Sequence, residues 1–327
     1  MKKKRILALF LAAVSCLSLA VSASAASATT RKATDFKDYD RTAWYAEAVS
    51  AAVDNGLLYG KSSTIIDPNG DMTRAEMAAI INRSFGCYKQ ADISQYKDVA
   101  KSKWYYKDVG LAVQMGTYNG RSSSTMAPDA PISRQEAMTV VARALELDYD
   151  SYSKTDLSAF TDRSEISNWA LPYVRAMVGA DYIHGRGKIL APQDNITRAE
   201  FAQIFANIIK NYINVKGEYV KDHDGNLLVR CTDVTLKDMT IKGDLIIGCG
   251  AADGKVTLDN VTVTGRLLVW GGGTKAVYCN NGTQMPEVVV ARVDDAVKVI
   301  YDRDSTLAVI DTIKTRITER AKQNKET

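Results

Sequence analysis

Residues 73–76 read Thr-Arg-Ala-Glu, residues 133–136 read Ser-Arg-Gln-Glu, and residues 197–200 read Thr-Arg-Ala-Glu again. In each copy a Thr or Ser is followed three residues later by a Glu, which is the pattern of a capping box at a helix N-terminus. Apolar residues then recur every three to four positions, as on one face of an amphipathic helix. The three copies therefore predict three helices that begin in the same way.

Other residues recur in the same order before each tetrapeptide. Each copy has an aromatic-x-Asp pair, then a tryptophan, then a glycine followed by a cation, and then a proline. The glycine follows the tryptophan by sixteen residues in all three copies. The recurring positions are Asp38, Asp98 and Asp162; Trp44, Trp104 and Trp169; Gly60, Gly120 and Gly185; Lys61, Arg121 and Arg186; and Pro68, Pro128 and Pro192. So many features in register establish a threefold internal repeat.

Each repeat has the pattern of a helix, a loop and a second helix. Valines four residues apart place an apolar face on the first helix, and Gly56, Gly116 and Asp181 stop it. One helical hairpin cannot bury its own apolar face, whereas three hairpins can bury theirs together around a common axis. The repeats are expected at residues 34–88, 92–150 and 156–213.

Taken together, these motifs resemble the S-layer homology domain in its usual set of three, over residues 36–210. The resemblance implies a pseudo-threefold helical spindle with grooves between the repeats. It also implies non-covalent binding of a secondary cell-wall polysaccharide or peptidoglycan-linked polymer, often carrying pyruvate ketals, on Gram-positive-type envelopes. It implies no catalysis.

The repeated residues suit an anionic sugar on chemical grounds as well. Arg74, Arg134 and Arg198 occupy the first helical position, where free N–H groups and the helix dipole favour anions. A guanidinium adds bidentate recognition of a carboxylate. The loop glycine lets the backbone approach a sugar, and the cation after it adds charge. We expect the arginines to be exposed, so that replacing one leaves the fold nearly intact.

Most of these residues have a structural interpretation too. The Thr and Glu of each tetrapeptide are expected to be capping groups. The tryptophans are expected to be wedges in the core more than faces for a sugar ring. The glycines are turn residues or sugar contacts, and the aspartates cap the first helix or orient an arginine. Ser133 and Gln135 depart from the pattern, which leaves the affinity of that groove open.

A different repeat follows the helical units. Residues 234–245 and 256–267 match at an offset of 22, with alternating apolar residues and breaks in parity at Asp238 and Gly243. This pattern predicts a short right-handed parallel β-solenoid of about four coils over residues 226–310, followed by a charged tail at 311–327. The fold class is thus α + β and multidomain. This half resembles the pectin-lyase-like β-helix modules attached to S-layer homology domains, but its stack contains no histidine and no catalytic constellation.

The first 25 residues have the pattern of a secretory signal peptide. A basic segment precedes an apolar run, and Ala23-Ser24-Ala25 is a small-x-small cleavage site. The alternatives are a membrane anchor or a lipoprotein signal ending at Cys16. Cleavage would remove four of the 42 basic side chains and leave them equal in number to the 38 acidic ones, which argues against nucleic acid as a partner.

Two residue types limit the possible chemistry. His184 and His223 are the only histidines, which argues against zinc or Ser-His-Asp sites. The mature chain keeps four cysteines, which either pair or serve as small buried hydrophobes. They are Cys87, Cys231, Cys249 and Cys279. No cofactor, metal or catalytic residue is predicted.

The leading hypothesis is a secreted protein without enzymatic activity, held at the cell wall or S-layer of a Gram-positive-type bacterium and displaying the solenoid. After signal cleavage no membrane contact is expected, and the solenoid's partner is not indicated. One alternative is a wall-anchored carbohydrate-active enzyme whose solenoid is the catalytic module. Another is self-assembly into an S-layer lattice.

Overall fold

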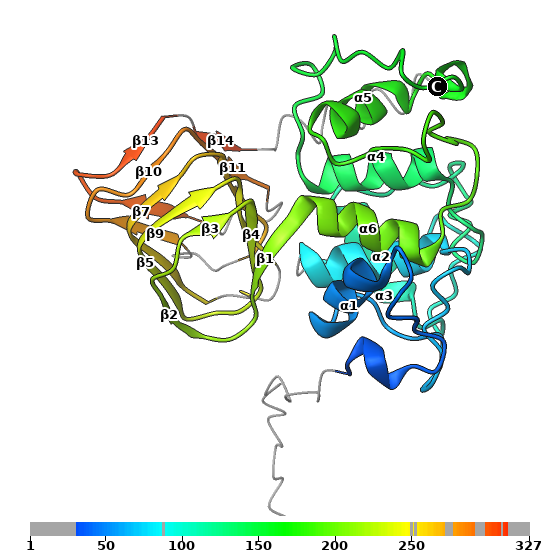
Figure 1. Cartoon of the computed structure of the whole chain (residues 1–327), viewed down its shortest axis with the longest axis horizontal. Helices are drawn as coiled ribbons and strands as arrows, with labels where there is room; N and C mark the ends of the chain where they lie inside the picture. The colour runs from blue at the N-terminus through cyan, green and yellow to red at the C-terminus, as the bar shows by residue number, and fades with distance from the viewer. Residues whose placement is uncertain are drawn as a thin grey trace, which may run out of the picture. The chain divides into compact units, whose positions relative to one another are not determined.

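The computed structural model describes residues 31–86, 89–248, 251, 254–271, 277–291, 298–308 and 310–312. The predicted signal peptide, Cys87, Cys249 and all but the first two residues of the predicted tail lie outside the described residues. Six α-helices come first and parallel strands follow them (Figure 1). Within the described ranges, no helix is both long and apolar enough to span a bilayer.

Each repeat contributes two helices, as predicted, the first of nine residues and the second of eleven. The helices are α1 (Ala46–Asp54), α2 (Arg74–Ser84), α3 (Tyr106–Gln114), α4 (Arg134–Ala144), α5 (Leu171–Gly179) and α6 (Arg198–Ile208), with 3₁₀ turns η1 (Ala33–Asp35) and η2 (Arg163–Glu165). The predicted capping boxes are confirmed, because the hydroxyls of Thr73, Ser133 and Thr197 accept from the N–H of the Glu three residues later. The Glu side chain accepts in turn from the N-cap N–H.

The three repeats close into a ring. Ile132 N–H donates to Met72 O, Ile196 N–H to Ile132 O, and Met72 N–H to Ile196 O, each at 3.0 Å. The second helix of each repeat packs on the first helix of the next, so that α2 meets α3, α4 meets α5 and α6 meets α1. The helical faces meet in one buried core. The expected pseudo-threefold arrangement is therefore present.

The strands form two parallel sheets that stack as about four coils. One has the order β1-β4-β6-β8-β11-β14, and the other contains β12-β9-β7-β10-β13 with β5, β2 and β3. Their bounds are β1 (Ile209–Ile213), β2 (Gly217–Tyr219), β3 (His223–Asp224), β4 (Asn226–Val229), β5 (Val234–Lys242), β6 (Leu245–Ile247), β7 (Val256–Val263), β8 (Arg266–Val269), β9 (Val277–Asn280), β10 (Gln284–Met285), β11 (Glu287–Val290), β12 (Val299–Tyr301), β13 (Thr306–Leu307) and β14 (Ile310–Thr312). The predicted offset of 22 is the actual register, since Val234 pairs with Val256.

The first sheet starts earlier than residue 226. Strand β1 follows α6 directly and pairs in parallel with β4, although its residues were expected in the third helical repeat. The predicted corner at Asp238 is present, with a left-handed backbone at φ +49° and again at Asn260 with φ +56°. Asn260 Nδ2 donates to Asp238 Oδ1 at 2.7 Å, so the corner residues of successive coils are hydrogen-bonded.

The sheet containing β4, β6, β8 and β11 is buried on both faces. Alternate residues fill the solenoid, while the column Leu228, Ile246, Leu268 and Val289 belongs to the helical core. Trp270 is fully buried beside this column, and its Nε1–H donates to Ala144 O at 2.8 Å. Burial on both faces explains why these strands are continuously apolar instead of alternating.

Candidate functional site

The repeated arginines are buried, so their expected exposure is wrong. Arg74, Arg134 and Arg198 begin their helices as predicted, but their exposed fractions are 5%, 4% and 2%. Each side chain crosses to the next repeat, where its Nε–H donates to a backbone carbonyl. The acceptors are Met126 O at 3.0 Å, Leu190 O at 2.7 Å and Ile66 O at 2.8 Å.

The N-termini of these helices do not offer free N–H groups to an anion. The N–H of Arg74 donates to Ala130 O at 3.0 Å, and the N–H of Ala75 donates to Pro128 O at 2.9 Å. The equivalent bonds recur in α4 and α6. Because the neighbouring repeat already satisfies these donors, the anion site expected from the helix N-terminus alone is wrong.

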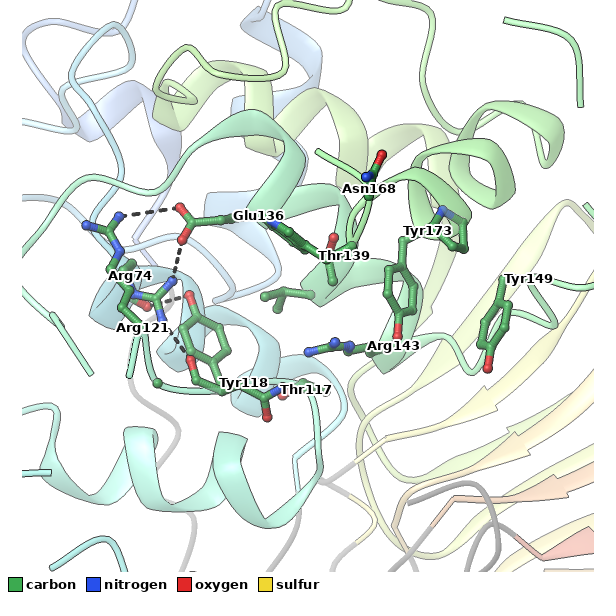
Figure 2. Close-up of a pocket in the computed structure, with 15 residues that line it drawn as sticks. Arg74, Thr117, Tyr118, Arg121, Glu136, Thr139, Arg143, Tyr149, Asn168 and Tyr173 are labelled. Atoms are coloured by element: carbon green, nitrogen blue, oxygen red, sulfur yellow. Dashed lines mark hydrogen bonds and ion pairs between the residues drawn. The ribbon is translucent and has the colours of Figure 1, made fainter. Parts of the chain in front are cut away.

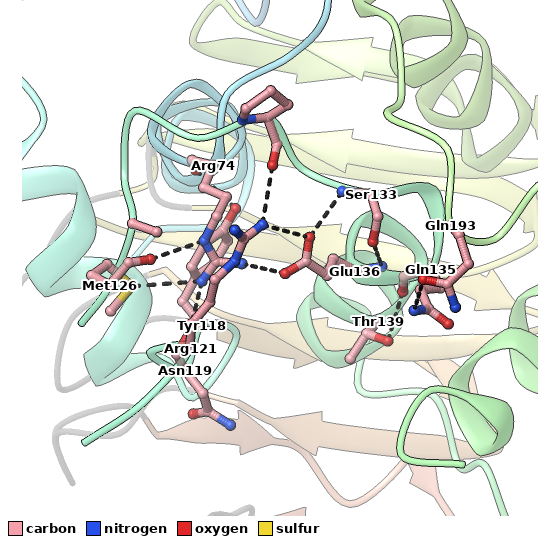
Figure 3. A network of polar contacts seen from close by, with 12 residues as sticks. Arg74, Tyr118, Asn119, Arg121, Met126, Ser133, Gln135, Glu136, Thr139 and Gln193 are labelled. Atoms are coloured by element: carbon pink, nitrogen blue, oxygen red, sulfur yellow. Dashed lines mark hydrogen bonds and ion pairs between the residues drawn. The ribbon is translucent and has the colours of Figure 1, made fainter. Parts of the chain in front are cut away.

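Each guanidinium contacts the capping glutamate of the next repeat, and Figure 3 shows this for Arg74 and Glu136. Arg74 Nη1 lies 2.8 Å from Glu136 Oε1, while Ser133 N–H donates to Oε2 at 2.9 Å. The cation after the loop glycine reaches the same carboxylate, with Arg121 Nη2 3.5 Å from Oε2. One carboxylate therefore caps a helix, receives the arginine of the preceding repeat and holds the loop cation.

The other two junctions repeat this arrangement. Glu76 receives Arg198 at 3.2 Å and Lys61 at 2.8 Å. Glu200 receives Arg134 at 3.1 Å and Arg186 at 2.6 Å. At this last junction Arg186 also pairs with Asp194 at 2.7 Å. The junctions at Glu76 and Glu136 thus join two cations to one carboxylate, whereas the junction at Glu200 is balanced by a second acid.

The environment fixes the charges of these groups. Burial raises the pKa of Glu76, but hydrogen bonds from Lys61 and Thr73 and the charge of Arg198 outweigh it, so that the net pKa is lowered. The pKa of Glu200 is lowered in the same way, with burial opposed by Arg186, Thr197 and Arg134. Both carboxylates are therefore ionised at neutral pH.

The repeated aspartates hold the loops that receive the arginines. Asp162 accepts from the N–H groups of Leu190 at 2.9 Å and Ala191 at 2.7 Å. Leu190 is the residue whose carbonyl accepts from Arg134. Asp38 and Asp98 bind the equivalent N–H pairs. Of the two roles considered, the aspartates orient the arginine, by fixing its acceptor carbonyl, and they do not cap the first helix.

The loop glycines are required by packing. A Cβ on Gly60 would lie 2.4 Å from the ring of Phe36 and 2.5 Å from Ser62 O. A Cβ on Gly120 would meet Tyr96 in the same way, and Gly185 meets Phe160 and has φ +75°. The aromatic ring of each aromatic-x-Asp pair therefore lies on the glycine of its own repeat.

The tryptophans are surface residues, so the interpretation as core wedges is wrong. Trp44, Trp104 and Trp169 are 63%, 60% and 46% exposed. Each ring precedes the first helix of its repeat, and that helix packs on the second helix of the preceding repeat. Two of these rings, Trp169 and Trp44, line cavities at inter-repeat boundaries.

A cavity of about 680 Å³, here called groove 1, lies at such a boundary (Figure 2). All three repeats line it, with Arg74 from the first, Glu136 from the second and Trp169 from the third. The lining residues further include Tyr118, Asn119, Gly120, Arg121, Thr139, Val140, Arg143, Tyr149, Asn168 and Tyr173. Groove 1 thus places three arginines and one glutamate among aromatic rings.

A second cavity of about 440 Å³, here called groove 2, occupies the equivalent position one repeat later. Trp44, Arg134 and Glu200 replace Trp169, Arg74 and Glu136. His184, Gly185 and Arg186 line it as Asn119, Gly120 and Arg121 line groove 1. The repeated arginine, loop glycine, loop cation and tryptophan therefore come together at both grooves, as the sequence pattern predicts.

The family model of the S-layer homology domain matches residues 35–78, 95–138 and 159–202. The chain carries three S-layer homology domains. Over 184 residues it is 33% identical to the "Surface-layer 125 kDa protein" of Lysinibacillus sphaericus, which covers 55% of this chain and 15% of that protein. It is 27% identical over 188 residues to the "Exoglucanase XynX" of Acetivibrio thermocellus, with 57% and 17% covered.

A third relative is the "Cellulosome-anchoring protein" of the same species, 29% identical over 151 residues, with 44% of this chain and 33% of that protein covered. The chain therefore spans a third or less of each of these relatives. Their names describe a surface layer, an anchoring protein and a glycanase.

At the boundary between the first and second S-layer homology domains, the equivalent residues are Arg198, Tyr59 and Trp104. Arg198 donates to Tyr59 O, and Trp104 is exposed beside α3. Here Arg83 lies 4.0 Å from the centroid of the Tyr59 ring and donates to Leu57 O of its own domain.

Among the groove residues that the sequence pattern missed are Arg143, Tyr149 and Tyr173. Arg143 lies seven residues after Glu136, on the same helical face, and this spacing was the available signal.

Within the described ranges, no group of three or more His, Cys, Asp and Glu side chains is placed to hold a metal ion. Cys231 and Cys279 are free thiols, and burial raises the pKa of Cys231 to about 11 and that of Cys279 to about 12.

Proposed function

We propose that the three S-layer homology domains bind an anionic secondary cell-wall polysaccharide, with pyruvate ketals as the anionic groups, and so hold the chain at the cell wall. The observation that carries this proposal is the composition of groove 1. An exposed tryptophan offers a face for a sugar ring, and two arginines meet one glutamate in a cavity that a third arginine also lines. A carboxylate entering the groove finds fixed guanidinium groups that cost no reorganisation.

The fold holds the arginine side chains in fixed positions for this function. Their backbone and carboxylate partners lock them in place, so that the positive charge stands at the groove before any ligand arrives. A preorganised site loses less conformational entropy on binding. The names of two relatives, a surface-layer protein and a cellulosome-anchoring protein, agree with a wall-bound role.

Binding to purified walls tests this function. We expect the protein to sediment with walls and to stay in solution after the secondary polymer has been extracted with acid. Binding to extracted peptidoglycan as strong as binding to intact walls would contradict the proposal.

An enzymatic role for the solenoid is a second proposal, because one relative is named as an exoglucanase. The likeness to an exoglucanase covers 57% of this chain but 17% of that enzyme, so most of the enzyme has no counterpart in the match. Incubation with wall polymers and uronate polysaccharides decides it. New reducing ends, lost when a solenoid carboxylate such as Asp259 is replaced, would support a catalytic solenoid.

A further inference from the structure

One face of α4 carries two charged groups into groove 1. Glu136, Val140 and Arg143 line the cavity from successive turns. Seven residues separate Glu136 from Arg143, which is about 10.5 Å along a helix at 1.5 Å per residue. Groove 1 therefore has one cationic centre at Glu136, where Arg74 and Arg121 meet, and another at Arg143 (Figure 2).

Each centre combines a guanidinium with an aromatic ring. Arg74 Cζ lies 5.1 Å from the centroid of the Tyr118 ring, and Arg143 Cζ lies 4.8 Å from that of Tyr173. Tyr149 packs edge-on against Tyr173 with centroids 5.6 Å apart. Arg143 is 9% exposed and lines the cavity, so an anionic group that reaches its guanidinium meets it largely away from water.

Groove 2 lacks the second centre. The residue equivalent to Arg143 is Asn207, whose Nδ2 donates to Tyr182 O at 3.1 Å. Gln203, which replaces Thr139, donates to Asn207 Oδ1 at 3.0 Å. The first centre of groove 2 is weakened as well, because Asp194 pairs with Arg186. The two grooves thus share a tryptophan and a buried arginine but differ in charge at the far end.

We propose that groove 1 recognises two adjacent anionic units of one polysaccharide strand, and that Arg143 is the residue that selects the second unit. Groove 2 recognises a single anionic unit. This inference rests on the proposed function, because it assigns a ligand length and charge to the same grooves. The second anionic group is a carboxylate or a phosphate, both of which a guanidinium binds through two parallel hydrogen bonds.

Tryptophan fluorescence can observe each groove separately. The chain has four tryptophans, of which Trp270 is fully buried. Replacing Trp44 and Trp104 with Phe leaves Trp169 to report on groove 1. Replacing Trp104 and Trp169 leaves Trp44 to report on groove 2. Three probes are titrated: a disaccharide with one pyruvate ketal and a neutral neighbour, the same disaccharide with a carboxylate on the neighbour, and the same with a phosphate there.

The reporter of groove 1 should bind a dianionic probe at least tenfold more tightly than the monoanionic one, and the reporter of groove 2 should bind them about equally. Arg143→Asn, which copies groove 2, should remove the preference of groove 1, and Arg143→Lys should keep part of it. The better of the carboxylate and phosphate probes identifies the second group. Thermal melts of both variants show whether they are folded.

If both grooves prefer the dianionic probes to the same extent, the inference is overturned. This comparison needs no substitution at Arg143, so it decides the question even if the Arg143 variants do not fold. An unchanged preference in folded Arg143→Asn would overturn it too. In both cases tight binding of the monoanionic probe would leave the proposed function standing. If no probe quenches either reporter, the proposed function itself fails.

Discussion

The helical ring and the solenoid are both built from repeats, but different interactions hold the repeats together. In the ring, each repeat sends a charged side chain into the next, and the third repeat returns one to the first through Arg198 and Glu76. In the solenoid, apolar residues such as Val234 and Val256 stack in columns. A closed ring has no end at which to fray, whereas a stack opens from its ends. We therefore expect local damage to act on the whole ring but on single coils of the solenoid.

Breaking one link of the ring should have the largest effect. Arg198→Ala leaves the Ile66 and Tyr59 carbonyls and one side of Glu76 without the guanidinium. Removing one partner of a buried ion pair costs about 3–5 kcal/mol. Urea unfolding should show a loss of that size in the helical transition.

Lys61→Ala is the matched control, because Lys61 binds the same carboxylate from a partly exposed position. Surface pairs contribute about 1 kcal/mol or less. If the two variants unfold at the same urea concentration, the buried arginine is not what links the third repeat to the first.

A cavity in the solenoid should have a somewhat smaller and more local effect. Leu236 is fully buried between coils, and Leu236→Ala removes apolar contacts at a cost of about 2–5 kcal/mol. Hydrogen exchange should speed up in the coils around β5 and leave α2 and α3 unchanged. Thr235→Ala, on the outward face of the same strand, should change neither. Faster exchange throughout the helical ring would show that the two regions do not respond separately.

Acid should destabilise the helical ring through the carboxylates that link its repeats. The pKa values of Glu76 and Glu200 lie below their ordinary value of 4.5 in the folded protein, so these groups stabilise it above that pH. The stabilisation is lost as pH falls through the folded pKa, because the unfolded chain takes up protons first. Helical circular dichroism should therefore melt at lower temperature as pH falls below about 4.5. Glu76→Gln should flatten this dependence, and an unchanged acid response in that variant would contradict the assignment.

Much of the architecture could be predicted from the sequence because its signals are local. A capping box involves residues three apart, as at Thr73 and Glu76, and the solenoid register is a direct offset of 22. The strand β1 was missed because its pairing with β4 leaves no local pattern in the sequence. The apolar column through Leu228 was missed because the helical core that covers it lies far away in the sequence.

Eight of the fifteen predicted site residues line grooves 1 and 2, but their environment was not predicted. The repeated arginine, tryptophan and loop cation do meet in grooves 1 and 2. Burial of Arg198 depends on Ile66 and Glu76, which lie more than 120 residues away, and no periodicity reports such a contact. Exposure of the tryptophans was likewise invisible, because an aromatic residue before a helix suits a core or a surface equally.

We propose that the exposed tryptophans and fixed arginines make the grooves bind an anionic wall polymer. The most direct test is titration of the purified polymer into the chain with Trp44, Trp104 and Trp169 all changed to Ala. The tryptophans are exposed, so the melting temperature should stay close to that of the unchanged protein, while affinity falls at least a hundredfold, about 2.8 kcal/mol. Removing the pyruvate ketals from the polymer should have a similar effect on the unchanged protein. A folded triple variant that binds the polymer with full affinity would contradict the account.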